Sequence, residues 1–196
     1  AALRSQLLER ALNRGLHDDE AARAQLHQWF RQKGVDTDDA EDNAGHARQV
    51  LLVACSGWAT FANLLQGAAE NMLYELLPCV TLMNKDHFVI VVRYEEGVTD
   101  KAGLNQALKR VSDTLKCSVF AALGPVAVDD EGLRASFHSA KDVFAYQGLL
   151  GSSGLYTPQD IGERSGSRTV CTEKEESELA AILMADNVTD LRHWVN

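Results

Sequence analysis

The sequence predicts an α/β protein of the α+β kind, in which helices pack on one mixed sheet. Between residues 49 and 157, strand-like and helix-like segments follow each other in the order strand, helix, strand, strand, helix, strand, helix, strand. A short polar break separates the two consecutive strands, which is typical of a β-hairpin. The helical segments on both sides of this hairpin can act as crossovers between strands of one sheet.

Two amphipathic helices are predicted before the first strand. Residues 3–15 carry leucines on one face and end at a glycine, and residues 18–33 begin with two aspartates and carry Leu, Trp and Phe on one face. The stretch that follows, DTDDAEDNAG, is acidic. We therefore expect an N-terminal helical pair over residues 1–35 and an acidic linker over residues 36–48.

The first predicted strand, at residues 49–57, is the continuous apolar run QVLLVACSG, which is typical of a strand buried on both faces. A helix is expected over residues 58–77, where large apolar residues recur at helical spacing and a proline follows. The hairpin comes next, at residues 81–92. Its turn has the sequence NKDH, and Asn and Asp tolerate tight turns.

The second half of the pattern contains two helices and two strands. A helix is expected over residues 100–116, and a strand run over 117–128 that a Gly-Pro pair interrupts. Another helix is expected over residues 130–151, followed by a short edge strand and a turn over 154–161.

These elements predict one domain over residues 49–161. The polar stretch GERSGSR indicates a flexible joint, which we assign to residues 162–172. Two short amphipathic segments after it indicate a C-terminal helical linker over residues 173–196. The chain does not begin with Met and starts inside a helical pattern, so we expect it to be a fragment of a longer protein.

The composition narrows the class of protein. The chain has 196 residues, a formal net charge of −9 and no cluster of Lys and Arg, so we do not expect it to bind DNA or an anionic membrane by itself. No apolar run is long enough to span a membrane. The four cysteines form no CxxC pair, so we expect buried free thiols and a cytoplasmic location. They are Cys55, Cys79, Cys117 and Cys171.

Motifs for the common catalytic chemistries are missing from the sequence. There is no phosphate-binding GxxxxGK[ST] loop, no GxGxxG after a strand, and no GxSxG around the serine of CSGW. The six histidines are scattered without the spacing of metal ligands. We therefore expect no cofactor and no metal site.

The turn NKDH and the phenylalanine after it are the candidate functional residues. This region resembles the GGDEF-type diguanylate cyclase fold, whose hairpin carries Gly-Gly-Asp-Glu-Phe. The matching residues here are Asn84, Lys85, Asp86, His87 and Phe88. The later segment SVFAALGPVAVDDEGLRASFHSAKDVFAYQG also resembles that family, which has a strand, a loop and a helix rich in Ala and Lys there. The resemblance implies a mainly antiparallel sheet of the nucleotide-cyclase kind.

Departures from the family pattern imply that catalysis has been lost. The two glycines let GTP approach the backbone in the family, and both positions carry side chains here. His87 replaces the acidic residue that serves metal and catalysis, and residues 54–56 read Ala-Cys-Ser where the family has an Asp for Mg²⁺. Glu75 and Pro78 occupy the Arg and Asp places of the family's inhibitory product site. We interpret the turn as the remains of an active site and expect no enzymatic activity.

The flanks narrow the resemblance further. The helical pair, the segment SFHSAKDVFAYQGLLGSSGLYTPQDI and the tail ESELAAILMADNVTDLRHWV resemble the central region of YesN-type response regulators of the AraC family. Such a region lies between a receiver domain and a pair of helix-turn-helix motifs, neither of which is found in this chain. The resemblance implies a non-catalytic signalling module of a two-component transcription regulator, working through homodimerisation or ligand sensing. DNA would bind only the absent helix-turn-helix domain, and an upstream sensor kinase would act on the absent receiver.

Two other interpretations of the turn stay open. The chain could be a stand-alone sensor of a nucleotide or small molecule, in which Lys85 and His87 meet an anion; otherwise both are solvated hairpin residues. A divergent nucleotide cyclase or phosphotransferase would use Asp86, His87 and Lys85, although one acid and one base do not replace a metal site. Ligand-dependent thermal stabilisation would indicate the first, and Mg²⁺-dependent turnover of GTP or ATP the second.

Overall fold

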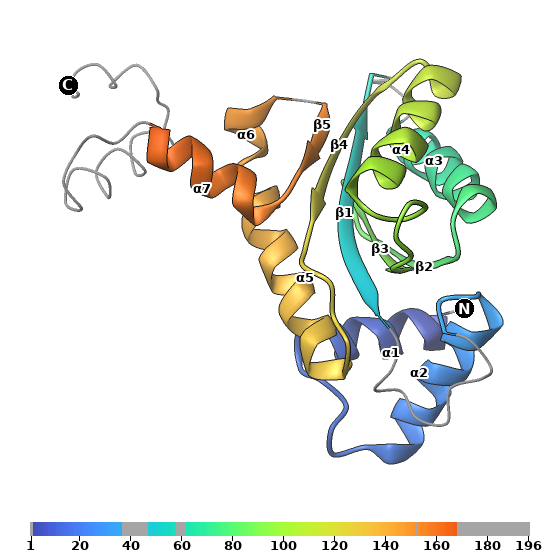
Figure 1. Cartoon of the computed structure of the whole chain (residues 1–196). Coiled ribbons are helices and arrows are strands. Elements are labelled where there is room, and N and C mark those ends of the chain that lie inside the picture. Colours follow the sequence, from blue (N-terminus) through green and yellow to red (C-terminus); the bar gives the residue numbers. More distant parts are fainter. Residues whose placement is uncertain (1, 37–46, 58–61, 152, 168–196) are drawn as a thin grey trace.

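The computed structural model describes residues 2–36, 47–57, 62–151 and 153–167, and these contain a five-stranded sheet with helices on both faces (Figure 1). The strands are β1 (Arg48–Ser56), β2 (Cys79–Met83), β3 (Phe88–Arg93), β4 (Ser118–Leu123) and β5 (Gly154–Tyr156). They lie in the order β2-β3-β1-β4-β5, with every neighbouring pair antiparallel except β4 and β5. This mixed, mainly antiparallel sheet confirms the predicted fold class.

The helices of the described residues cover the sheet in two layers. They are α1 (Ala2–Asn13), α2 (Glu20–Gln32), α3 (Ala62–Leu76), α4 (Lys101–Leu115), α5 (Asp130–Phe144), α6 (Gln147–Leu150) and α7 (Pro158–Ser167). One core cluster lies between α3, α4 and the sheet, and the other lies between α1, α2, α5 and the opposite face. An aspartate caps α2, α4 and α5, because the side chains of Asp19, Asp100 and Asp129 each accept a bond from the backbone N–H three residues later.

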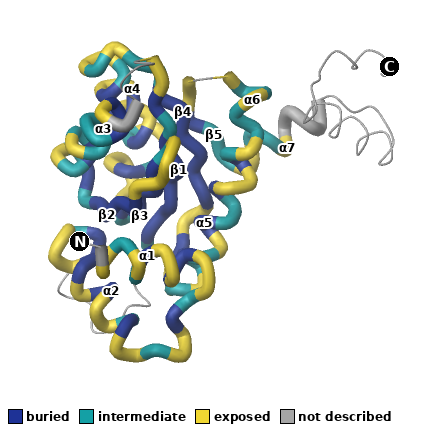
Figure 2. The backbone as a smooth tube through the Cα atoms, turned by 180° about the vertical axis from the view of Figure 1, so that it is seen from behind, coloured by how far each residue is buried: buried dark blue, intermediate teal, exposed yellow. Residues whose placement is uncertain are grey.

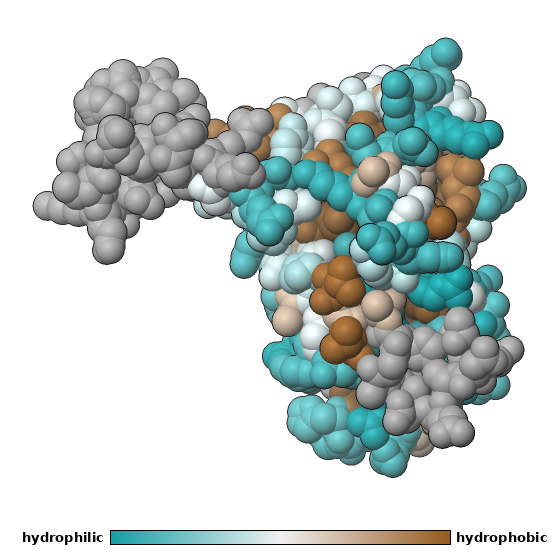
Figure 3. Space-filling model, viewed as in Figure 1, coloured by the Kyte–Doolittle hydropathy of each residue, from teal (hydrophilic) through white to brown (hydrophobic). Residues whose placement is uncertain are grey.

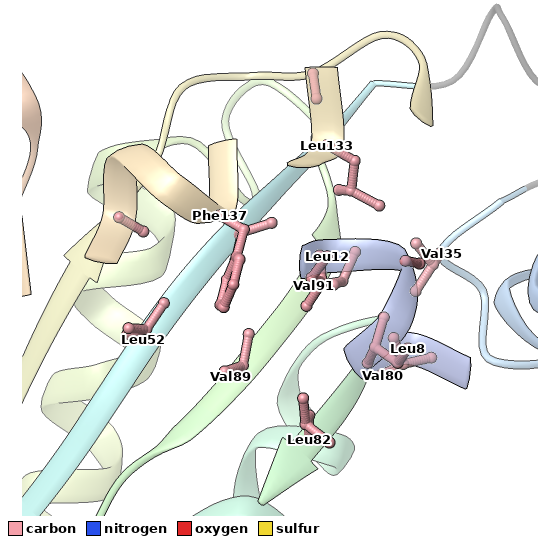
Figure 4. Close-up of a cluster of buried hydrophobic side chains, with 14 of the residues drawn as sticks. Leu8, Leu12, Val35, Leu52, Val80, Leu82, Val89, Val91, Leu133 and Phe137 are labelled. Carbon is pink, nitrogen blue, oxygen red and sulfur yellow. The ribbon is translucent and has the colours of Figure 1, made fainter. Parts of the chain in front are cut away.

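The central strand β1 is buried on both faces, as its apolar sequence predicts (Figure 2). Val50 and Leu52 belong to the cluster under α1 and α5, whereas Leu51 and Val53 belong to the cluster under α3 and α4. This alternation follows from the two-residue period of a strand. Figure 4 shows the cluster under α1 and α5, where side chains of these two helices point toward those of β1, β2 and β3.

β4 ends at Leu123, and Gly124 and Pro125 interrupt the strand run as the sequence predicts. The region after them differs from the sequence-based prediction in two places. The predicted helix over 130–151 is divided into α5 and the short α6. Helix α7 occupies residues that were predicted as a turn and the start of a joint. The Thr157 N–H donates to Asp160 Oδ2 over 2.8 Å, and the Asp160 N–H donates to the Thr157 hydroxyl over 3.4 Å. These two bonds form a capping box, which starts a helix whose first residue is a proline.

Several predicted features lie outside the described residues, namely most of the acidic linker, Cys171 and the C-terminal helical linker. Cys55, Cys79 and Cys117 are free thiols. On the face seen in Figure 3, hydrophobic residues form separate patches with hydrophilic residues between them. Within the part of the chain that the structure describes, no helix combines the length and apolar composition needed to cross a bilayer.

Candidate functional site

The hairpin turn connects β2, at one edge of the sheet, with β3. Met83 pairs with Phe88 across the two strands, and the backbone N–H of Asn84 donates to the carbonyl of His87 over 2.9 Å. This hydrogen bond closes the turn at the residues that the sequence predicts.

Three polar side chains of the turn bind one another. His87 Nδ1 lies 2.8 Å from Asp86 Oδ1, and His87 Nε2 lies 3.2 Å from Asn84 Nδ2. With its proton on Nδ1, the imidazole donates to Asp86 and accepts from Asn84. The ring also contacts Phe144 of α5, with 4.9 Å between the centroids. The hydrogen bond from His87 holds the pKa of the Asp86 carboxyl below its usual range, so this exposed group is a carboxylate at neutral pH.

The other two candidate residues lie in different environments. Lys85 is exposed at the tip of the turn, whereas Phe88 is fully buried. Phe88 belongs to the cluster under α3 and α4 and pairs with Val53 of β1. The structure therefore groups Asn84, Asp86 and His87 at the turn and assigns Phe88 to the core.

A buried glutamine joins the end of β1 to the hairpin turn. The Gln66 side chain of α3 is buried, and its amide nitrogen donates to the carbonyl oxygens of Cys55 and Asp86, each over 3.2 Å. One amide NH₂ group has two hydrogens, so it can make both bonds at once. This residue was not predicted from the sequence, where its signal is a polar side chain beside Leu65 on the apolar side of a helix.

The end of β1 offers no charged side chain. Cys55 is buried, and burial raises the pKa of its thiol to about 12, so the thiol stays protonated. The residues on its two sides are Ala54 and Ser56. Among the described residues, no group of three His, Cys, Asp or Glu side chains is placed to hold a metal ion.

A comparison with protein families finds a match over most of the chain. The family described as GGDEF-like domain matches residues 6–146, more than half of the chain. The chain belongs to the GGDEF-like domain family. One similar solved structure is "A Novel Interaction Mode between a Microbial GGDEF Domain and the Bis-(3, 5)-cyclic di-GMP", with 18% sequence identity and a TM-score of 0.40. The match covers 68% of this chain and 88% of that chain. No curated protein matches this chain.

In this GGDEF-like domain, the residues at the turn and the strand end do not fit a magnesium ion. Mg²⁺ requires hard oxygen ligands in a nearly octahedral arrangement. The Cys55 thiol is protonated, and Gln66 directs hydrogen-bond donors toward the carbonyls of the strand end and the turn. The Asp86 carboxylate is 84% exposed and bound to His87. One solvated carboxylate is a poor substitute for a magnesium site.

The positions of the family's inhibitory product site also carry different residues in this GGDEF-like domain. Glu75 is exposed near the end of α3, and Pro78 lies between α3 and β2. The pattern Arg-x-x-Asp requires a guanidinium at the position of Glu75 and a carboxylate at the position of Pro78, and neither residue supplies the group that its position requires. The product-site pattern is therefore absent before the hairpin, as its sequence indicates.

Proposed function

We propose that this GGDEF-like domain is a non-catalytic regulatory module of a DNA-binding transcriptional response regulator. The receiver and helix-turn-helix domains of that regulator lie outside this chain, and the module works in the cytoplasm as a homodimer. The observation that supports the loss of catalysis is the pair of hydrogen bonds that Gln66 donates to Cys55 and Asp86. This amide group connects the end of β1 to the hairpin turn, where enzymes of this kind need acidic ligands for a metal.

The packing of the N-terminal helices supports a role in transmitting a signal. Leu8 and Leu12 of α1 share a core cluster with Val80 and Leu82 of β2, the first strand of the hairpin (Figure 4). A change in the position of α1 would therefore alter the packing of the hairpin. Packed elements with more than one arrangement are the usual route by which domains couple. The net charge of −9 and the lack of a Lys and Arg cluster in the sequence support the proposal that another domain binds DNA.

Purified protein with GTP and Mg²⁺ is expected to release no more pyrophosphate than a sample without protein. The physical reason is the lack of acidic metal ligands at the strand end, so restoring the turn alone should not create activity. The variant Asn84→Gly/Lys85→Gly/His87→Glu is therefore also expected to be inactive. An active diguanylate cyclase in the same assay is the positive control.

Mg²⁺-dependent pyrophosphate release by the wild type would contradict this expectation if Asp86→Ala abolished it. Such a result would make the turn a working, divergent active site. Activity that appears only in the restored turn variant would show that the strand end is competent, and the Gln66 argument would be wrong.

The regulator context is tested by reading the gene on both sides of this segment. We expect an upstream receiver domain with an acidic phosphorylation pocket and a downstream pair of basic helix-turn-helix motifs. A start codon and a stop codon at the present ends would exclude the response regulator and leave a stand-alone domain. In that case a thermal-shift series with nucleotides, using Lys85→Ala and His87→Ala as controls, would test for a sensor.

A further inference from the structure

A buried cluster of four charged or titratable side chains joins two helices and the central strand. Asp36 accepts hydrogen bonds from Arg48 Nε and Nη2, each over 2.8 Å. His27 Nδ1 lies 3.3 Å from Asp36 Oδ2, and His27 Nε2 lies 3.1 Å from Asp130 Oδ2. The side chains of His27, Asp36 and Arg48 are at most 2% exposed. We call these four residues the N-terminal clamp.

The clamp lies where the N-terminal helix pair meets the rest of the fold. His27 belongs to α2 and Asp36 follows it, whereas Arg48 begins β1 and Asp130 begins α5. Figure 1 shows these elements at the same end of the molecule. The Arg48 guanidinium also lies 5.1 Å from the centre of the Phe30 ring of α2. The clamp therefore connects α2 to both β1 and α5.

Two protonation states of His27 suit this geometry. As an imidazolium, His27 donates to Asp36 through Nδ1 and to Asp130 through Nε2. As a neutral ring, it donates to Asp130 and accepts at Nδ1 from Arg48 Nη2, which lies 3.3 Å away. The charged state gives the clamp two positive and two negative groups. The neutral state leaves one negative charge uncompensated in a buried cluster, which is unfavourable.

The clamp has a path for proton exchange with water. The Asp130 side chain is 35% exposed and lines a cavity of about 480 Å³ between the α1–α2 connection and the start of α5. The same cavity is lined by Leu26 and Leu133. Other titratable or charged groups facing the cavity are His17, Arg23, Asp129 and Glu131. Arg23 pairs with Glu20, and Asp129 caps α5.

We propose that protonation of His27 strengthens the attachment of the N-terminal helix pair to β1 and α5, and that its deprotonation weakens this attachment. The clamp is thereby a pH-sensitive contact between the N-terminal helices and the sheet.

The electrostatic balance gives the pH range. Burial alone lowers the pKa of His27, but hydrogen bonds to Asp130 and Asp36 outweigh burial and raise the pKa above its ordinary value of 6.5. A group whose pKa is raised on folding stabilises the folded state fully below its unfolded pKa. The stabilisation is then lost as pH rises through the folded pKa. The attachment should therefore be strongest below pH 6.5 and weaken above it.

Hydrogen exchange across pH tests the proposal on the whole chain. After correction for intrinsic exchange rates, amides of α2 are expected to lose protection relative to β3 between pH 6 and 8.5, because deprotonation of His27 removes a charge that holds this helix to Asp130 and Asp36. His27→Gln should abolish this relative change, because the amide keeps a polar group but cannot gain charge. His138→Gln on α5 is the matched control and should retain it.

Unchanged relative protection in the wild type, or the same pH dependence in His27→Gln, would overturn the proposal. If His27→Gln does not fold, ¹⁵N-histidine NMR of the wild type and of Asp130→Asn replaces it. Asp130→Asn keeps the Asp129 cap of α5. We expect one histidine of the wild type to have a pKa above 6.5, and we expect this pKa to fall in Asp130→Asn. If no histidine of the wild type has a raised pKa, the proposal is wrong.

Discussion

Replacing Arg48 with Met is expected to lower the free energy of unfolding by about 3–5 kcal/mol, the usual loss when one partner of a buried ion pair is removed. Arg48 is fully buried and makes two 2.8 Å hydrogen bonds to Asp36, whose side chain is 1% exposed. Met fills a similar volume but leaves the Asp36 carboxylate without its guanidinium. Thermal unfolding should show a fall in Tm of roughly 6–20 °C for a chain of this size.

Arg93 provides the matched control, because it pairs directly with Arg48 across the β1–β3 ladder. Its side chain is 31% exposed and lies 3.5 Å from Glu95. Arg93→Met is expected to cost less than about 1 kcal/mol, as partly exposed ion pairs usually do. The double variant Asp36→Asn/Arg48→Met should be more stable than Arg48→Met, because it also removes the buried negative charge that has lost its guanidinium. Equal losses for Arg48→Met and Arg93→Met would show that the pair with Asp36 contributes little.

The order of elements and the hairpin were predictable because their signals are local. The apolar run of β1, the periodicity of α4 and the NKDH turn each depend on residues close in sequence. Such features can be predicted directly from the pattern of apolar and polar residues. Helix α7 was missed although its signal is local too. Thr157, Pro158 and Asp160 form a capping pattern at the start of that helix, and the glycines further on suggested a joint instead.

The connections within the site could not be predicted from the sequence. Gln66 contacts carbonyls of β1 and of the hairpin, and these contacts exist only after α3 has packed on the sheet. His27 and Asp130 are 103 positions apart, and a scattered histidine gives no sequence signal of a buried partner. The family resemblance identified which turn residues had changed. It did not reveal that an amide group joins the turn to the strand end.

Substituting Ala for Gly124 is expected to destabilise the fold by about 3 kcal/mol or more, at or beyond the upper end of usual overpacking losses. A Cβ at this position would lie 2.1 Å from the backbone oxygen of Ser136 and 2.5 Å from its hydroxyl. Gly124 follows β4 where α5 crosses the sheet, and its N–H donates to Val50 on β1 over 2.9 Å. Helix α5 would have to move away from the sheet. Urea unfolding measures the loss, as a lower midpoint at a nearly unchanged slope.

The same substitution at Gly67 should have the opposite sign. Gly67 lies inside α3, and a Cβ there would meet nothing within 4 Å. Gly67→Ala is therefore expected to stabilise the fold by about 0.5–1 kcal/mol, because alanine restricts the unfolded chain and favours the helix. Ser136→Ala should not rescue Gly124→Ala, since the nearest atom is a backbone oxygen. If Gly124→Ala left the stability unchanged, or if Ser136→Ala rescued it, α5 would lie farther from β4 than the backbone positions of Gly124 and Ser136 indicate.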